Sequence, residues 1–248
     1  MNKYIVNLTE AENTHCKASL FLFPYAGGGT AVFKEWVNYF SDINLFCILY
    51  PGRENRFSEK ALEDIDLLAN DIFNEMENTI DFSKPYFLFG HSMGTKVVYE
   101  VALRIQKSGY RSPTGVIISA GRAPCFMEPN PIHHLDNEGF IEGIKRFSGT
   151  PKEIIENENL MRLFLPMLRA DFIIDEKYCR EDNEKLSSDM LSLMGDNDVE
   201  MTVDELLKWK DFTENNFFYK MIEGGHMFIN TNKEDVIKNV SEFIGHYI

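Results

Sequence analysis

Short apolar stretches alternate with amphipathic stretches along most of this 248-residue chain, and few folds satisfy such an alternation. Each apolar stretch has the length and composition of a buried strand. Strands that alternate with helices run parallel and are joined by crossovers, so helices cover both faces of the sheet. The sequence therefore predicts the α/β class with a mostly parallel central sheet, its strands at residues 19–24, 45–50, 85–89, 115–120, 190–194 and 217–222.

The amphipathic stretches predict helices at 62–76, 97–105 and 233–246, where apolar side chains recur every three or four residues. The interval 122–186 differs, because it contains no convincing strand and only two weak helical patterns. A connection of this length inside a compact domain is usually a functional insertion. We expect one domain over residues 1–248, with 122–186 as a helical lid. A structural layer without a role in access is the alternative.

The composition is acidic: 25 Lys and Arg residues against 39 Asp and Glu residues, a formal net charge of −14. Such a chain repels phosphate backbones and anionic membranes, so we expect no nucleic acid partner and no membrane binding. No stretch approaches the roughly 20 apolar residues that span a bilayer, and residues 1–15 show no secretory signal. The four cysteines, which form no C-x-x-C pair, indicate inert packing thiols in a reducing cytoplasm and disfavour zinc: Cys16, Cys47, Cys125 and Cys179.

The segment Gly90-His91-Ser92-Met93-Gly94 joins an apolar strand directly to an amphipathic helix. This is the setting of a nucleophile elbow, a tight G-x-S-x-G turn in which only glycine is comfortable on either side of the serine. The turn lifts the Ser92 hydroxyl above the sheet edge, near a helix N-terminus whose free N–H groups favour developing negative charge. Ser92 is therefore the candidate nucleophile, and an ordinary N-cap serine is the alternative.

A serine hydroxyl needs a base that takes its proton, and His226 is the best placed of the six histidines. It follows the last predicted strand on a loop opened by two glycines, which suits the chain order nucleophile, acid, base of hydrolases with this elbow. The other five histidines fit less well: His91 adjoins the serine, His15 precedes it, His246 lies in the final helix, and His133 and His134 are expected to be solvated lid residues.

The acid of such a triad holds the imidazole in one tautomer and stabilises its protonated form. Between the serine and the histidine, the segment Gly195-Asp196-Asn197-Asp198 follows a predicted strand and offers two carboxylates. Either aspartate could instead cap the turn by bonding its own backbone. The residues alone therefore leave Asp196 and Asp198 as alternatives.

Three consecutive glycines, residues 27–29, follow the first predicted strand. Their backbone can approach a ligand closely, which suits a second oxyanion donor next to the one supplied by the residue after the nucleophile. A nucleotide-binding loop is disfavoured, because the run matches neither G-x-x-x-x-G-K-[ST] nor G-x-G-x-x-G. A flexible turn is the remaining alternative.

Taken together, these segments resemble the type II thioesterases of nonribosomal peptide and polyketide assembly lines. These are stand-alone α/β-hydrolase proteins related to the thioesterase of animal fatty acid synthase. The resemblance runs nearly end to end. Its most specific segments are P-G-R-E at 51–54 and L-P-x-L-R-A-D at 165–171, since many esterases share the elbow. Tyr25 stands where the family frequently has histidine, and Thr95 where glycine or alanine is common.

The resemblance implies the α/β-hydrolase fold, with the insertion as a lid over an acyl pocket. It implies Ser92 as nucleophile, His226 as base and Asp198 as acid, with the backbone N–H groups of Ala26 and Met93 as oxyanion donors. The implied reaction is hydrolysis of acyl or aminoacyl thioesters from the phosphopantetheine arm of acyl or peptidyl carrier proteins. No metal or cofactor of the enzyme's own is expected, because the phosphopantetheine belongs to the carrier. The resemblance also implies a monomer.

Two other functions compete with this one. A carboxylesterase or lipase with the same triad is the main alternative, and an acyl-binding scaffold without turnover is the second. Carrier proteins of these systems tend to be acidic, so an acidic thioesterase would be repelled from them at long range. We therefore expect a small basic or apolar docking patch beside the pocket mouth, drawing on lid arginine or lysine side chains.

Overall fold

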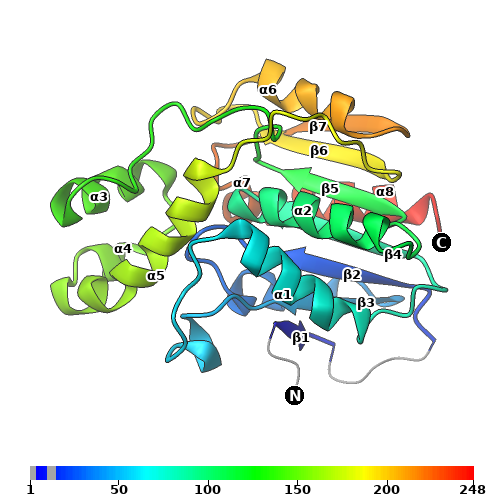
Figure 1. Ribbon diagram of the computed structural model, residues 1–248, viewed down its shortest axis with the longest axis horizontal. Helices are drawn as coiled ribbons and strands as arrows, with labels where there is room; N and C mark the ends of the chain where they lie inside the picture. Colours follow the sequence, from blue (N-terminus) through cyan, green and yellow to red (C-terminus); the bar gives the residue numbers. More distant parts are fainter. Residues whose placement is uncertain (1–3, 10–14) are drawn as a thin grey trace.

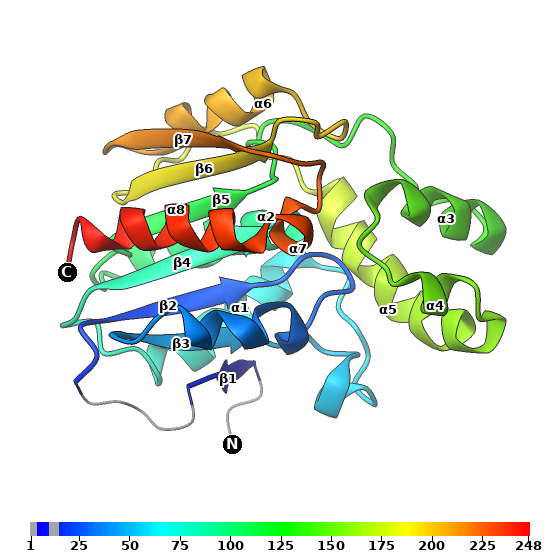
Figure 2. The ribbon, with the colours of Figure 1, turned by 180° about the vertical axis from the view of Figure 1, so that it is seen from behind.

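The computed structural model describes residues 4–9 and 15–248, which form one seven-stranded sheet with helices on both faces (Figures 1 and 2). The strand order is β1-β3-β2-β4-β5-β6-β7, and every neighbouring pair is parallel except β1 with β3. The strands are β1 (Ile5–Asn7), β2 (Ala18–Phe23), β3 (Ile43–Ile48), β4 (Tyr86–His91), β5 (Gly115–Ser119), β6 (Asp189–Gly195) and β7 (Phe217–Ile222). The mostly parallel sheet confirms the predicted α/β architecture.

The central strands are buried on both faces, which is why they read as unbroken apolar runs. In β2, Phe21 and Phe23 pack into the core on one face of the sheet, while Leu20 and Leu22 pack into the core on the other face. Because successive side chains of a strand point to opposite faces, both cores need apolar residues at every position.

Two groups of helices cover the two faces of the sheet. Helices α1 (Ile65–Glu77) and α2 (Met93–Lys107) lie on one face, and α8 (Lys233–Gly245) with the 3-10 segment η1 (Thr30–Asn38) lies on the other (Figures 1 and 2). Helix α1 begins later than predicted, because the Asp64 carboxylate accepts the first backbone N–H groups and caps it there. The remaining short segments outside the insertion are η2 (Glu54–Arg56), α6 (Val203–Leu207), η4 (Lys208–Phe212) and α7 (Phe228–Thr231).

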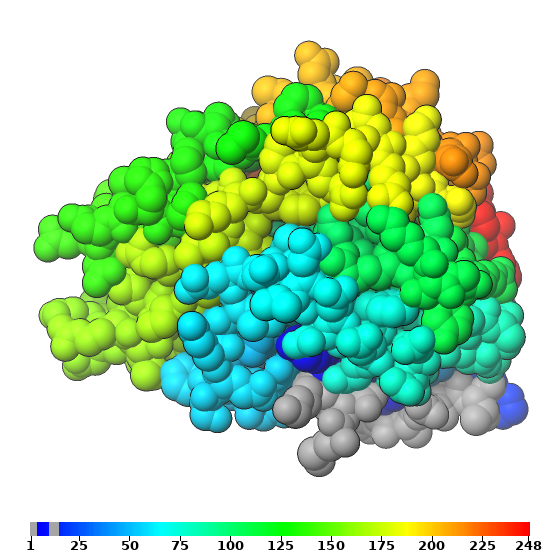
Figure 3. Space-filling view, viewed as in Figure 1, coloured from blue at the N-terminus to red at the C-terminus, as the bar shows by residue number. Residues whose placement is uncertain are grey.

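The insertion between β5 and β6 is helical, as the sequence predicted. Its elements are α3 (Asn137–Ile144), η3 (Lys145–Phe147), α4 (Lys152–Ile155) and α5 (Glu158–Lys177), of which α4 was not expected. They lie beyond the carboxyl ends of the parallel strands (Figures 1 and 2) and project as a lobe at one end of the molecule (Figure 3). The lobe has a small apolar core of its own, centred on Phe140, Met161 and Phe172. This core gives the insertion a defined shape above the sheet edge.

Two further expectations concern membrane spans and thiols. Within residues 4–9 and 15–248, no helix has the length and apolar character needed to cross a bilayer. Cys16 and Cys47 are buried packing residues, as expected. The expectation is wrong for Cys179, which is exposed and whose Sγ lies 3.6 Å from the carbonyl oxygen of Cys125, so these two positions are neighbours in the fold.

Candidate active site

Ser92 lies between the end of β4 and the start of α2 in a strained backbone conformation. Its φ is 52° and its ψ is −120°, values that a residue with a side chain rarely adopts. Such strain costs on the order of 1–3 kcal/mol and persists only where the surroundings hold it. Here the Ser92 N–H donates to the Ser119 carbonyl at 2.8 Å, and the Ser92 carbonyl accepts from the Thr95 hydroxyl at 2.7 Å. Thr95, a departure from the family pattern, thus supports the turn.

The two glycines of the elbow are required by close backbone contacts. A Cβ atom on Gly90 would lie 2.4 Å from the carbonyl oxygen of Gly94. A Cβ atom on Gly94 would lie 2.3 Å from the carbonyl oxygen of Phe23 in the neighbouring strand. Neither backbone atom can move aside, so the G-x-S-x-G spacing reflects the packing of β4 and α2 against β2.

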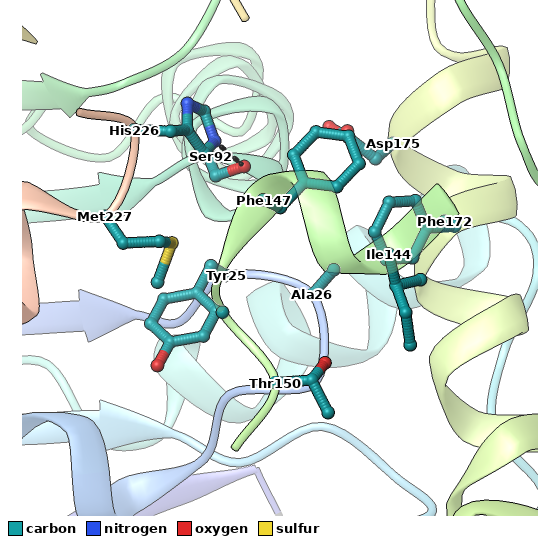
Figure 4. Close-up of a pocket in the computed structure, with 11 residues that line it drawn as sticks. Tyr25, Ala26, Ser92, Ile144, Phe147, Thr150, Phe172, Asp175, His226 and Met227 are labelled. Atoms are coloured by element: carbon teal, nitrogen blue, oxygen red, sulfur yellow. Dashed lines mark hydrogen bonds between the residues drawn. The ribbon is translucent and has the colours of Figure 1, made fainter. Parts of the chain in front are cut away.

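A hydrogen-bonded relay joins the three side chains that the sequence singled out. His226 Nε2 lies 3.0 Å from Ser92 Oγ (Figure 4), and His226 Nδ1 lies 2.9 Å from Asp198 Oδ2. The second carboxylate oxygen of Asp198 accepts the backbone N–H of Glu200 at 2.8 Å. The Asp198 side chain is 0% exposed and that of His226 is 10% exposed, so little water competes for these hydrogen bonds.

The geometry separates the two aspartates that the sequence left as alternatives. Asp196 is exposed, and its Oδ1 accepts the backbone N–H of Gly224 at 2.9 Å. It therefore pins the loop that precedes His226, whereas Asp198 contacts the imidazole itself.

Three other histidines lie near the elbow or in the insertion. His91 is fully buried, with Nδ1 2.8 Å from the Ser119 hydroxyl, and burial together with the nearby His226 holds the pKa of His91 well below its ordinary value. It stays neutral beside the relay. His134 is exposed, as expected, but the same expectation is wrong for His133. Its Nδ1 lies 2.6 Å from a carboxylate oxygen of the buried Glu176, which also accepts the His133 backbone N–H.

The glycine run after β2 forms a tight turn beside the serine. The Gly28 N–H donates to the Tyr25 carbonyl at 2.8 Å, and Gly27 has a φ of 79° while Ala26 keeps a negative φ. This combination defines a type II turn, which requires glycine at its third position. Ala26 lines the same pocket as Ser92. Met93 is buried at the first position of α2, where helical N–H groups lack intrahelical partners.

Two pockets meet at the relay, and both are lined by Ser92, Phe147, Asp175 and His226. The first is mainly apolar, and Figure 4 shows its walls reaching the serine from the insertion and from the loop after β2. Its other lining side chains include Tyr25, Ile144, Phe172 and Met227. The second has polar walls that include Lys96, Arg122, Glu128 and Glu200.

The charged side chains of the polar pocket are paired with one another. Lys96 Nζ lies 2.7 Å from Asp175 Oδ1. Arg122 forms ion pairs with Glu128 and Glu205, and Arg146 lies 3.1 Å from Glu128 and 3.3 Å from Glu200. Burial raises the pKa of Glu200, opposed by Arg146 and His226. The arginines at the base of the insertion are thus neutralised by carboxylates.

Sequence reasoning did not identify Phe147, Phe172 and Asp175 as pocket residues. The last two are three positions apart on α5 and therefore share a helix face. Helical periodicity could have grouped them, but only the docking of α5 over the sheet edge brings that face to Ser92. Residues 4–9 and 15–248 contain no group of three or more His, Cys, Asp or Glu side chains that could hold a metal ion.

A strained serine between strand and helix, joined to histidine and aspartate at the carboxyl edge of a mostly parallel sheet, defines an α/β hydrolase. The chain belongs to the thioesterase domain family, which matches residues 18–244. It is 31% identical over 240 residues to the gramicidin S biosynthesis protein GrsT of Aneurinibacillus migulanus, covering 96% of this chain and 92% of GrsT.

Two further proteins are similar to this chain over nearly their whole length. The chain is 31% identical over 234 residues, 92% of its length, to 88% of a Brevibacillus parabrevis protein named linear gramicidin dehydrogenase LgrE. The glycine run at 27–29 does not contain the dinucleotide fingerprint G-x-G-x-x-G that a dehydrogenase of the Rossmann type would need. The solved structure of YbtT, a type II thioesterase from the yersiniabactin NRPS/PKS pathway, superimposes with a TM-score of 0.89 at 29% identity, covering 98% of this chain and 99% of YbtT.

Proposed function

We propose that this chain is a type II thioesterase that hydrolyses acyl or aminoacyl groups from the phosphopantetheine arm of carrier protein domains. The observation that carries the proposal is the Asp198–His226–Ser92 relay at the junction of two pockets, in a member of the thioesterase domain family. The names of GrsT and YbtT refer to gramicidin S biosynthesis and to an NRPS/PKS pathway, which supports a carrier-bound substrate.

The first half of the reaction forms an acyl-enzyme. Ser92 Oγ attacks the thioester carbonyl carbon while His226 Nε2, 3.0 Å away, accepts the hydroxyl proton. Asp198 accepts the Nδ1–H hydrogen bond and stabilises the imidazolium. The N–H groups of Ala26 and Met93 bind the oxyanion. The C–S bond then breaks, His226 returns its proton to the departing sulfur, and the acyl group remains as an ester on Ser92.

The second half releases the acid. A water molecule attacks the ester carbonyl as His226 takes one of its protons, and the same proton passes to Ser92 Oγ when the ester C–O bond breaks. A thiol has a pKa of about 8.5, so it leaves more readily than an alkyl alcohol and requires less help from the imidazolium. Acylation by a thioester therefore requires less proton donation from His226 than acylation by an alkyl ester.

The two pockets suit the two sides of the substrate. The apolar pocket takes the acyl group. Its walls, which include Ile144, Phe147 and Phe172, leave little free space beside Ser92. It therefore favours short acyl groups. The polar pocket, lined by Lys96, Arg122 and Glu128, offers hydrogen-bonding partners for the amide groups of the pantetheine arm.

The carrier protein itself docks beside the polar pocket, on an apolar rather than a basic patch. Arg122 and Arg146 are neutralised by carboxylates and do not form a free basic surface. Met127 and Val199 are 65% and 88% exposed, and each adjoins in sequence a glutamate of the ion-pair network. These glutamates, Glu128 and Glu200, line the polar pocket, and exposed apolar patches beside a binding groove are typical of protein–protein contacts.

The experiment that tests the proposed function compares carrier-bound and simple substrates. Carriers loaded with short acyl, long acyl or aminoacyl groups, and alkyl esters of the same acids, are incubated with the pure protein. We expect kcat/KM to be highest for short acyl groups on carriers and to vanish with Ser92→Ala. Faster hydrolysis of the alkyl esters would identify a carboxylesterase or lipase, and turnover by Ser92→Ala would contradict the assigned nucleophile.

A further inference from the structure

A buried ion pair links two segments that are 118 positions apart in the chain. Arg53, from the loop after β3, contacts Asp171 of α5 through two hydrogen bonds: Nη1 to Oδ2 at 2.9 Å and Nη2 to Oδ1 at 2.7 Å. Both side chains are only 4% exposed. They belong to the P-G-R-E and L-P-x-L-R-A-D segments, and the triad and the pocket walls leave both residues unexplained.

The same ion pair is hydrogen-bonded to the turn that contains Ala26. Asp171 Oδ2 accepts the backbone N–H of Gly27 at 2.7 Å, and Arg53 Nη1 donates to the carbonyl of Gly28 at 2.9 Å. The Ala26–Gly27 peptide of a type II turn can flip to the type I orientation, which would turn this N–H away. A buried carboxylate that accepts the N–H opposes that flip, because hydrogen bonds to charged groups are the strong ones.

Neighbouring residues of both segments hold the turn on either side. A Cβ atom on Gly27 would lie 2.6 Å from Leu168 Cδ2, so the turn packs directly against the face of α5 that also presents Asp171. Glu54, next to Arg53, accepts the backbone N–H of Thr30 at 2.6 Å and its hydroxyl at 2.7 Å. The turn is therefore fixed from the insertion and from the loop after β3 at the same time.

We infer that Arg53 and Asp171 are positioning residues for the oxyanion turn and that the insertion helix α5 thereby sets the placement of the Ala26 N–H. This inference rests on the proposed function in one respect, the role of Ala26 as an oxyanion donor. Neither residue lines a pocket together with Ser92, so both act through the backbone of the turn. Loss of one oxyanion donor lowers kcat by about 10²–10³-fold, and a displaced donor costs part of that.

The test compares Asp171→Asn with Glu100→Gln. Glu100 is also buried and accepts hydrogen bonds from Arg104, Tyr178 and Arg180, but it contacts neither the turn nor a pocket with Ser92. Asp171 accepts from the Gly27 N–H and from both Arg53 Nη groups, and an amide has a single acceptor oxygen and places its NH2 group against these donors. With p-nitrophenyl acetate, we therefore expect Asp171→Asn to lower kcat by about 10- to 100-fold and to change KM by less than about 3-fold. An alkyl trifluoromethyl ketone, which forms an oxyanion on Ser92, should bind more weakly by the factor lost in kcat/KM. Glu100→Gln should lower the thermal midpoint without these effects.

Two further measurements decide the inference if Asp171→Asn folds poorly or if the ester is not a substrate. Arg53→Lys keeps the charge but cannot donate in the bidentate geometry, so a fall in kcat of about 3- to 10-fold is expected. Hydrogen exchange of the Gly27 amide should accelerate at least 10-fold in folded Asp171→Asn and not in Glu100→Gln. Wild-type kcat in folded Asp171→Asn, or unchanged Gly27 exchange, would overturn the inference. Absence of Ser92-dependent hydrolysis in the wild type would instead overturn the proposed function.

Discussion

The Asp198 carboxylate lies 2.9 Å from His226 Nδ1, while the neighbouring Asp196 accepts the Gly224 N–H and holds the loop that precedes His226. Both aspartates follow the end of β6, but Asp198 binds an imidazole and Asp196 binds a backbone N–H. This division allows the relay and the loop to be tested separately with the same chemical change.

Asp198→Asn should lower kcat by about 10⁴-fold, because the amide favours the wrong imidazole tautomer. Asp196→Asn should change kcat by less than about 3-fold, since an amide oxygen can still accept the Gly224 N–H. Steady-state kinetics on an acyl thioester measures both. A larger loss from Asp196→Asn than from Asp198→Asn would contradict the assignment of the acid.

Gly94→Ala should destabilise the fold. The added Cβ would lie 2.3 Å from the Phe23 carbonyl oxygen and 2.8 Å from the Pro24 carbonyl oxygen. Backbone atoms at the end of a central strand cannot move aside without a large energetic cost. We expect the free energy of unfolding to fall by about 3 kcal/mol or more. Gly245→Ala is the matched control, because a Cβ there meets nothing within 4 Å. Urea denaturation of both variants checks the difference, and equal stabilities would refute the packing argument.

Phe147→Ala should broaden acyl preference. The ring lines both pockets and lies 5.2 Å from the Phe172 ring, so its removal joins the apolar and polar pockets. We expect the ratio of kcat/KM for long over short acyl thioesters to rise by about 10-fold. Phe164→Ala is the control, because Phe164 lines neither pocket with Ser92. An unchanged ratio in Phe147→Ala would place the acyl chain elsewhere.

Val199→Asp should weaken carrier recognition without harming the chemistry. A charge replaces an apolar side chain that is 88% exposed and next in sequence to Glu200 of the polar pocket. We expect kcat/KM for an acyl-loaded carrier to fall by about 10-fold. Hydrolysis of p-nitrophenyl acetate should stay within about 2-fold of wild type. Tyr219→Asp, on the edge strand β7, serves as control. Equal effects of the two variants on the carrier substrate would remove Val199 from the docking surface.

Acid should destabilise the protein partly through His91. Burial holds the pKa of His91 in the folded state well below its unfolded value of about 6.5. Below about pH 6.5 this imidazole binds a proton in the unfolded chain but stays neutral in the folded protein. The free energy of unfolding therefore falls by up to about 1.4 kcal/mol for each unit by which the pH is lowered. His91→Gln should lose this part of the slope. Urea denaturation of both proteins between pH 4.5 and 8 measures it, and parallel pH profiles would contradict the argument.

The elbow and the order of the triad could be predicted from the sequence because both depend on local features. Ser92 follows a strand and precedes a helix, and chain order together with the glycine loop after the last strand selects His226. The roles stay predictions until the kinetics are measured, but the structure brings these side chains to hydrogen-bonding distance. The strand β1 was missed, since three residues on an antiparallel edge carry almost no periodic signal.

The remaining features could not be predicted, because they depend on contacts between distant segments. Asp196 and Asp198 differ only in which way the loop turns after β6. The expectation that His133 is solvated was wrong, because Glu176, 43 positions later in the chain, packs against it and contacts its Nδ1. Arg53 and Asp171 were visible only as parts of motifs, and their pairing emerges when α5 packs over the loop after β3.

The anchoring of the glycine turn to α5 has a consequence for engineering. A chimera that receives the insertion of another hydrolase, in order to change its acyl preference, would also exchange the residue opposite Arg53. If the graft carries no carboxylate at the position of Asp171, the Arg53 guanidinium is left buried without a counter-charge, and the Gly27 amide has no acceptor. Grafts into this scaffold should therefore be designed with the loop after β3 and the insertion exchanged as one unit.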